Sequence, residues 1–245
     1  MKSFITKLNF AIFITGVAAL FLGSCAGPYS IGYPIDPLET SQIKYATPVL
    51  VRNFADRRPV NERFYDDQNE HYDFFSLDKD FVDPVDKSIT KAFQIELANA
   101  GFEVADAGNF IIGEKPYIRI AGDILHFYVS RKELPLNTIK QGEKTLWRKN
   151  QYTVRVTIRI KVIDAKSRKL VMKRTYTSSD TFTLRSEMID VKAYTEGKPI
   201  EKSKWQVAGD DYSIQLLNKN LKNVLVQARK DIVKLLSPVD LKFTE

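Results

Sequence analysis

The chain has 245 residues, of which 44% are hydrophobic and 27% are charged. These fractions are those of a folded globular protein and exclude a low-complexity or largely disordered chain. The formal charge of +7 makes the chain mildly basic, and its single cysteine excludes an internal disulfide.

The first 24 residues have the pattern of a secretory signal peptide. Lys2 and Lys7 give a basic start, and residues 10–22 form an apolar run. That run is shorter than the ~20 apolar residues that a membrane-spanning helix needs. A short apolar run between a basic start and small residues is typical of a cleaved signal. We therefore predict that residues 1–24 are removed and take no part in the fold.

The only cysteine follows this segment directly. Leu22, Gly23 and Ser24 precede Cys25, and the four residues resemble the lipobox of bacterial lipoproteins. The resemblance implies that a signal peptidase cleaves before Cys25 and that the new N-terminal cysteine carries acyl chains. The alternative is a buried free cysteine at the end of an ordinary membrane anchor.

Residues 25–40 are predicted to form the lipidated cysteine and a flexible tether. Prolines and glycines interrupt residues 26–37, and such a segment favours an extended chain with a rise of ~3.1 Å per residue. In lipoproteins of enteric bacteria, an aspartate after the acylated cysteine retains the protein at the inner membrane. Ala26 stands at that position here. The resemblance therefore implies the outer membrane, with the domain in the periplasm.

Residues 41–238 are predicted to form one domain, followed by a C-terminal tail at 239–245. The first strand is expected at residues 48–54, where a continuous apolar start indicates burial. A long loop rich in aromatic and acidic residues follows at 60–82. Its His71 adjoins Glu70, but the spacing matches none of the calcium or zinc templates, so we predict no metal site.

The middle of the chain predicts a helix and then strands. Asp83 and Pro84 suit the start of a helix over 85–100, and Gly101 suits a left-handed cap at its end. A short edge strand is expected at 102–104. The strand at 117–130 changes its apolar parity near Gly122, which predicts a β-bulge there, with Leu125 on the inner face. His126 is expected to lie on the opposite face, partly exposed.

Two further strands and a last helix complete the domain. Residues 152–162 alternate strictly between apolar and polar, and residues 170–176 continue that pattern after a turn. Residues 131–150 and 178–209 are predicted to be long loops. An apolar stripe that begins after Asp210 and Asp211 predicts a long amphipathic helix, which Pro238 ends.

These elements predict an α+β fold. The expected architecture is a two-layer α/β sandwich with the order β-α-β-β-β-α, in which two amphipathic helices cover one face of a mixed, mostly antiparallel sheet of about four strands. Over residues 49–58, 89–104 and 156–176 the chain resembles the YajG-like group of bacterial lipoproteins. Its layout is also similar to that of LptE and of transporter-auxiliary lipoproteins. The resemblance implies a family without catalytic residues.

A basic surface is a second candidate feature. Strand alternation places every second residue of 152–162 on the solvent side, where basic side chains recur. A basic segment around Trp147 could extend this surface, and Lys173 on the next strand could join it. The candidate residues for binding an anionic surface are Lys144, Arg148, Lys149, Arg155, Arg159, Lys161 and Lys173.

No phosphate-binding loop, nucleophile elbow or zinc-protease motif occurs in the sequence. We therefore predict a non-catalytic, membrane-anchored envelope protein that binds a protein partner, with no cofactor and no nucleic acid. Two alternatives stay open. One is a binder of an anionic envelope lipid or polymer, and the other is a hydrolase whose site includes Asp66, Asp67 and His71.

Overall fold

The computed structural model describes residues 29–32, 44–64, 73–74, 76–105, 117–134, 145–190 and 204–236. The predicted lipobox, the C-terminal tail, and Asp66, Asp67, His71 and Lys144 lie outside these ranges. The predictions that depend on those residues therefore stay predictions.

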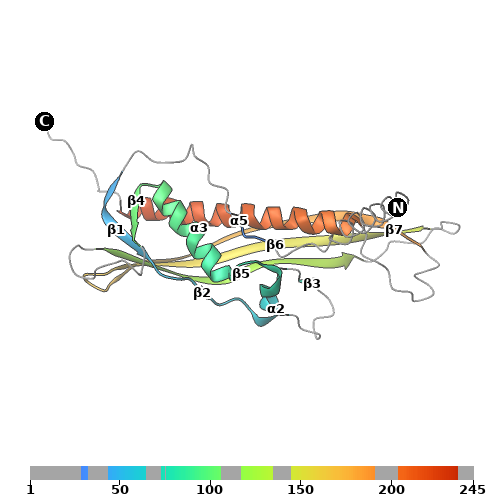
Figure 1. Ribbon diagram of the computed structural model, residues 1–245, viewed down its shortest axis with the longest axis horizontal. Helices are drawn as coiled ribbons and strands as arrows, with labels where there is room; N and C mark the ends of the chain where they lie inside the picture. Colours follow the sequence, from blue (N-terminus) through green and yellow to red (C-terminus); the bar gives the residue numbers. More distant parts are fainter. Residues whose placement is uncertain are drawn as a thin grey trace, which may run out of the picture.

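A long sheet with helices along it forms the domain (Figure 1). The strands are β1 (Tyr45–Val51), β2 (Ala55–Asp56), β3 (Asp73–Phe74), β4 (Phe102–Ala105), β5 (Ile118–Leu134), β6 (Thr145–Asp164) and β7 (Leu170–Asp190). The helices are α2 (Val60–Arg63), the 3-10 turn η2 (Asp78–Asp80), α3 (Val85–Asn99) and α5 (Lys204–Leu236).

The seven strands in the described part of the chain form one sheet with the order β4-β1-β5-β6-β7, and β2 and β3 both pair with β5. β1 runs parallel to β4 and β5, whereas β5, β6 and β7 are antiparallel. The α+β class is thus confirmed, and the expected number of about four strands is wrong. β2 and β3 are two residues long each, which is too short for any period to show in the sequence.

The three predicted long loops all contain regular structure. β5 extends to Leu134 and β6 starts at Thr145, so half of residues 131–150 are in strands; β7 extends to Asp190 and α5 starts at Lys204. The segment 60–82 contains α2, β3 and η2. The polar composition of these segments suggested loops. However, the ladder between strands is made by backbone groups and continues past the apolar core. Leu134 still pairs with Lys149, and Thr145 with Asp190.

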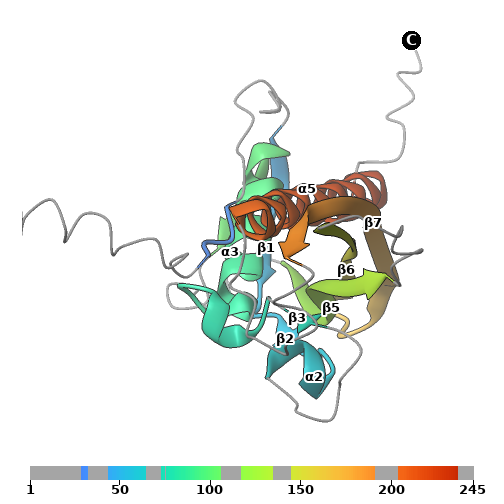
Figure 2. The ribbon, with the colours of Figure 1, turned by 90° about the vertical axis from the view of Figure 1, so that its right-hand side faces the viewer.

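α3 and α5 pack on the same side of the sheet and enclose one core (Figure 2). The apolar stripe of α5 contributes Leu217, Leu221 and Val224, none of which is exposed. β6 supplies the facing residues at alternate positions, as its pattern predicted. The buried residues from the other elements include Val49, Ile89, Phe93, Leu97, Ile120, Ile124, Phe127 and Val129. No helix in the described part of the chain is both long and apolar enough to cross a bilayer.

The irregularity in β5 lies at Leu125 and not at Gly122. The pairing with β6 shifts between Ile124 and His126, so Leu125 is the additional residue of a bulge and is only half-buried. The glycine at position 122 is required for a different reason. A Cβ atom at this position would lie 2.5 Å from the ring of Phe54, so the glycine lets that buried ring pack directly on the strand.

The ends of α3 agree in part with the sequence. Gly101 has a φ of 97°, which confirms the left-handed cap, because glycine adopts this conformation without steric cost. The start differs by one residue: Pro84 is the N-cap, and no side chain caps the helix. Asp83 is exposed and lies before it.

Part of the predicted tether is bound to the domain. The backbone of Tyr29 donates to the carbonyl of Asp80 at 2.6 Å and accepts from the amide of Val82 at 2.9 Å, which pairs Tyr29 with Phe81. Tyr29 and Ile31 also pack against the core. Residues 29–32 are therefore held against η2 and the start of α3.

Candidate functional site: a charge cluster at the edge of β5

β5 has two different edges. β6 pairs with one edge along almost its full length, whereas β1, β2 and β3 take up the other edge in turn. Among the described strands, none pairs with residues 125–129 on that second edge. Side chains take the place of a strand there. Arg58 donates to the carbonyl of Phe127 at 3.4 Å, and the amide of Val129 donates to Ser76 at 2.7 Å.

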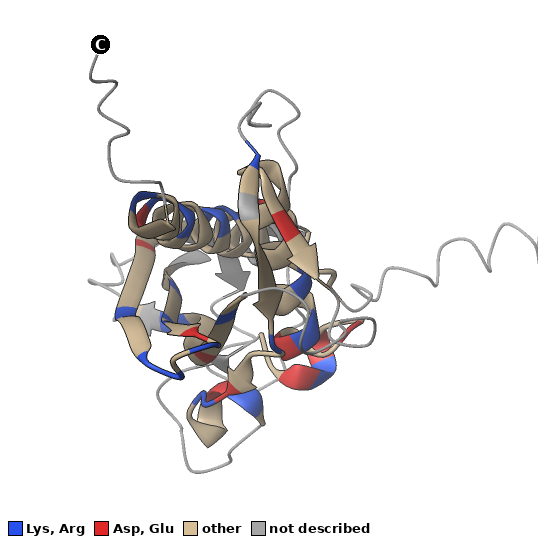
Figure 3. Ribbon diagram, turned by 90° about the vertical axis from the view of Figure 1, so that its left-hand side faces the viewer, with Lys and Arg blue, Asp and Glu red and all other residues tan. Residues whose placement is uncertain are grey.

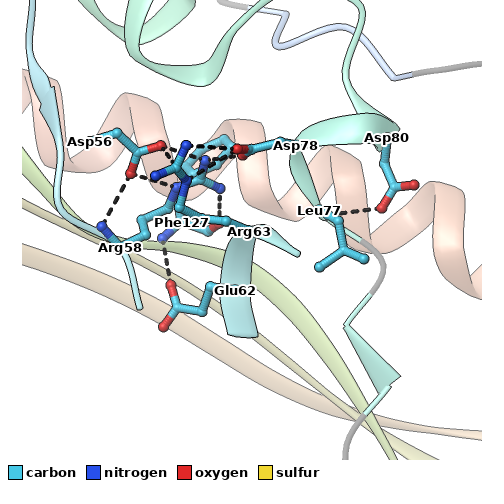
Figure 4. Close-up of polar contacts among 8 residues, drawn as sticks. All are labelled: Asp56, Arg58, Glu62, Arg63, Leu77, Asp78, Asp80 and Phe127. Atoms are coloured by element: carbon cyan, nitrogen blue, oxygen red, sulfur yellow. Dashed lines mark hydrogen bonds and ion pairs between the residues drawn. The ribbon is translucent and has the colours of Figure 1, made fainter. Parts of the chain in front are cut away.

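Arg58 lies at the centre of this cluster, between β2 and η2 (Figure 4). Its side chain has no exposed area. Two of its nitrogens, Nε and Nη2, donate to the carboxylate of Asp56 at 3.0 and 2.8 Å, and Nη2 also donates to Asp78. Arg63 contacts the same two carboxylates, at 3.2 Å to Asp56 and 3.0 Å to Asp78. Two arginines and two aspartates thus neutralise one another.

The ionisation of Asp56 reflects two opposed causes. Burial by itself would raise the pKa of its carboxyl, but the hydrogen bonds and positive charge of Arg58 outweigh it and leave the pKa below the ordinary value of 3.8. Burial by itself would lower the pKa of the Arg58 guanidinium. The hydrogen bonds and negative charges of Asp56 and Asp78 outweigh burial and raise this pKa. Both groups are therefore charged in the folded protein.

Glu62 and His126 form a second pair beside the cluster. Nδ1 of His126 lies 2.6 Å from Oε1 of Glu62, and the amide of Phe127 donates to the other carboxylate oxygen at 3.4 Å. Glu62 is buried and the His126 side chain is 30% exposed. Burial raises the pKa of the Glu62 carboxyl, and the bond to His126 offsets this only in part. The Glu62 carboxyl therefore holds its proton more tightly than an exposed glutamate does.

The sequence predicted a partly exposed His126, which the structure confirms, but not its partner. Glu62 lies 64 positions away in the chain, in a segment predicted to be a loop. No spacing rule joins residues so far apart. The arrangement fits a structural role: all six ionisable groups are paired, and the described residues contain no group of three potential metal ligands.

The predicted basic surface is assembled in part. Arg155, Arg159 and Lys161 lie on the outer face of β6, and Lys173 pairs directly with Lys161 across the β6–β7 ladder. An acid interrupts this surface: Asp123 of β5 lies 2.7 Å from Lys161 and 3.8 Å from Arg159.

Two of the remaining basic candidates lie in a strand and not in the predicted loop. Arg148 and Lys149 belong to β6, and their side chains lie outside the described part. Further basic residues recur along α5 (Figure 3), among them the exposed Lys219 and Lys230. The positive charge of the domain is thus spread over at least two surfaces.

One open hollow of about 330 Å³ lies between α3 and β4. Its lining residues are Gln94, Ile95, Ala98, Val104 and Ala105. None of them ionises, so this hollow offers shape and apolar contact but no acid–base chemistry.

The Glu62→Gln variant is expected to change the pH dependence of stability. Because the pKa of Glu62 is raised above 4.5, the folded state holds this proton more tightly than the unfolded state. The free energy of unfolding should therefore fall as the pH rises from about 4.5 through the raised pKa. Glutamine removes this ionisation, so the stability of the wild type relative to the variant should decrease over that range.

Urea unfolding at several pH values measures this difference. The exposed Glu103→Gln change on β4 is the matched control, and its difference from the wild type should not change with pH in the same way. A pH-independent difference for Glu62→Gln would show that burial does not shift this carboxyl.

The comparisons with known proteins give a weak likeness only. No family model and no curated protein matches the chain. A Xanthomonas campestris protein of the DUF330 family is similar over 84% of this chain and 94% of its own, at 11% identity and a TM-score of 0.43. Lipoprotein GNA1162 from Neisseria meningitidis is similar over 55% of this chain and 83% of its own, at 10% identity and a TM-score of 0.30. A minor lipoprotein from Acinetobacter baumannii is similar over 77% of this chain and 91% of its own, at 10% identity and a TM-score of 0.28. At these values the likeness assigns neither a family nor a function.

Proposed function

We propose that this protein is a non-catalytic lipoprotein of the YajG-like kind, anchored in the outer membrane through acylated Cys25, whose periplasmic domain binds a protein partner. The sequence from Leu22 to Cys25 supports the anchor. The full pairing of the ionisable groups around Arg58 supports a structural rather than a catalytic cluster.

The free edge of β7 is the observation that carries partner binding. β7 is 21 residues long and forms one border of the sheet. Among the described strands, only β6 pairs with it. Proteins usually protect such an edge by keeping it short or by placing a proline in it, and β4 at the other border has four residues. β7 is neither short nor interrupted by a proline. Charged side chains also protect an edge, and the exposed Lys173 and Arg174 provide this protection only near the start of β7, before residue 175.

The composition of β7 fits the addition of a strand from a partner. Alternate residues from 175 to 183 are exposed and are small hydroxyl residues: Thr175, Thr177, Ser179, Thr181 and Thr183. An extended segment of a partner could pair with this edge through backbone hydrogen bonds, while its side chains contact this polar row. The expected partner is therefore an envelope protein that presents an extended segment.

The outer sheet face supports the second candidate, an anionic lipid or polymer. Besides Arg155, Arg159, Lys161 and Lys173, strand alternation places Arg119 of β5 on this face, because Ile118 and Ile120 pack toward the core. Asp123 opposes them with one negative charge. The net positive charge favours an anionic ligand, although Lys161 already forms an ion pair with Asp123.

One experiment separates the two candidates. Crosslinked envelope preparations would be analysed by mass spectrometry for the wild type, for Thr181→Lys with Thr183→Lys on β7, and for Arg155→Glu with Arg159→Glu on the outer face. Lysines on an edge strand oppose strand addition, so the β7 pair should abolish a specific protein crosslink. Asn223→Lys with Gln227→Lys, on the exposed side of α5, is the control and should leave it intact.

The opposite results are equally informative. Loss of the crosslink only with the Arg155 and Arg159 changes would place the protein contact on the outer sheet face and refute the β7 edge as its site. A wild-type protein that gives no specific protein crosslink would refute partner binding.

A further inference from the structure

We infer that the domain lies directly against the lipid bilayer, with the surface around Tyr29 and Val82 turned toward the membrane. This inference rests on the proposed acylation of Cys25. It goes beyond the anchor itself, because a flexible tether over residues 25–40 would let the domain stand away from the membrane and turn freely.

The first argument is the length of chain between the lipid and the domain. Three residues separate Cys25 from Tyr29. Four steps between successive Cα atoms, at no more than ~3.6 Å each, span at most about 14 Å. The acyl chains hold Cys25 at the bilayer surface. Tyr29 must therefore remain close to that surface.

The second argument is that Tyr29 is fixed to the domain. Its backbone makes two hydrogen bonds to the segment after η2, at 2.6 Å to Asp80 and 2.9 Å to Val82. Phe81, its partner in the bridge, is buried and packs on Phe127 of β5, with ring centroids 5.7 Å apart. A short link to a fixed residue restrains the orientation of the whole domain.

The third argument is the apolar surface beside this attachment. Val82 donates its amide to the carbonyl of Tyr29, and its side chain is 60% exposed. An exposed valine side chain beside a lipid anchor is suited to the boundary between headgroups and acyl chains.

The charges of this face identify the kind of contact. Lys79 and Asp83 are both exposed beside Tyr29 and Val82, and their charges offset each other. Attraction to anionic lipid therefore contributes little here, and the contact should be insensitive to salt. Figure 2 shows α3 and the attachment segment, residues 29–32, on one side of the domain and β7 on the other. This orientation turns the free edge of β7 away from the membrane.

The test uses the full lipidated chain in vesicles of phosphatidylethanolamine and phosphatidylglycerol. The proposed lipid modification of Cys25 leaves no free thiol at that position, so an introduced cysteine is the only free thiol. Val82→Cys and the exposed Thr181→Cys on β7 would each carry the same fluorophore, and lipids with a headgroup quencher would report proximity to the bilayer. Quenching should be several-fold stronger at position 82 than at position 181, at low and at high salt.

An insertion of about ten Gly and Ser residues between Pro28 and Tyr29 tests whether the short link to Cys25 holds the domain against the bilayer. A flexible linker of this kind would let the domain move away and turn. The ratio of quenching at position 82 to quenching at position 181 should then fall toward one. Equal quenching at the two positions in the chain without the insertion, or a ratio that the insertion leaves unchanged, would overturn the inference. Protein that fails to float with the vesicles would refute the anchor, and the orientation with it. Protein that floats with equal quenching would refute the orientation alone.

Discussion

Replacing Cys25 with serine is expected to leave the protein as an uncleaved precursor that still carries residues 1–24. The cysteine thiol is the group that the lipobox resemblance assigns to acylation, and a serine hydroxyl does not replace it there. A single acyl chain binds membranes only marginally, whereas several chains hold a protein firmly. The wild type should therefore resist salt washing and require detergent for extraction. Mass spectrometry of the mature N-terminus measures the cleavage and the acyl mass directly.

Ser24→Ala is the matched control for this prediction, because it keeps a small residue before the cysteine. It should be cleaved and acylated like the wild type. A Cys25→Ser protein that still fractionates as a cleaved, detergent-requiring species would refute the lipobox interpretation. The domain itself should fold in either case, because the buried residues of its core lie between Val49 and Ile232.

The sequence predicted those elements whose side chains repeat with a regular period. The alternation of β6 and the stripe of α5 follow from such periods, and residues such as Val156, Ile158 and Leu221 are fully buried as expected. The outer parts of β5, β6 and β7 carry few apolar side chains at alternate positions, although Phe182 and Leu184 of β7 still pack against the core. Backbone pairing continues the strands there, and their mostly polar composition predicts loops.

The charge cluster could not be predicted because its members come from separate segments without a shared period. Arg58 and Asp78 are 20 positions apart, and Glu62 and His126 are 64 apart. Their proximity depends on the crossing of β2, α2 and η2 over the edge of β5. Asp123 illustrates the same limit, since only the β5–β6 register places it beside Lys161.

The cluster also connects the attachment segment to the sheet. Tyr29 binds the carbonyl of Asp80 at the end of η2, and Asp78 of the same turn binds Arg58. Arg58 in turn bonds to Phe127 in β5. A restraint applied at Tyr29 is thus carried to the central strand through a few buried polar contacts. Loss of Arg58 should weaken both the fold and the fixed orientation of the domain.

The Arg58→Ala variant is accordingly expected to lose about 3 kcal/mol of unfolding free energy. Removing one partner of a buried ion pair typically costs ~3–5 kcal/mol, because the other partner is left without compensation. The lower end applies here, since the side chains of Asp56 and Asp78 keep 15% and 30% exposure and Arg63 still contacts both. The carbonyl of Phe127 would also lose its bond to Arg58. Urea unfolding of a chain that starts at Ala26, and so retains Tyr29, measures the loss.

The neighbouring Arg57 provides the control, because its side chain is exposed and the Arg57→Ala change should cost less than about 0.5 kcal/mol. The loss of unfolding free energy for Arg58→Lys should lie between those for Arg57→Ala and Arg58→Ala, because lysine keeps the charge but cannot bond to Asp56 through two nitrogens. The pKa of Asp56 is lowered by Arg58, so the stability from this pair is present above the ordinary 3.8 and is lost as the pH falls through the lowered pKa. The difference between the wild type and Arg58→Ala should therefore shrink in acid. Equal losses for Arg57→Ala and Arg58→Ala would mean that the cluster adds nothing to the fold beyond ordinary surface charge.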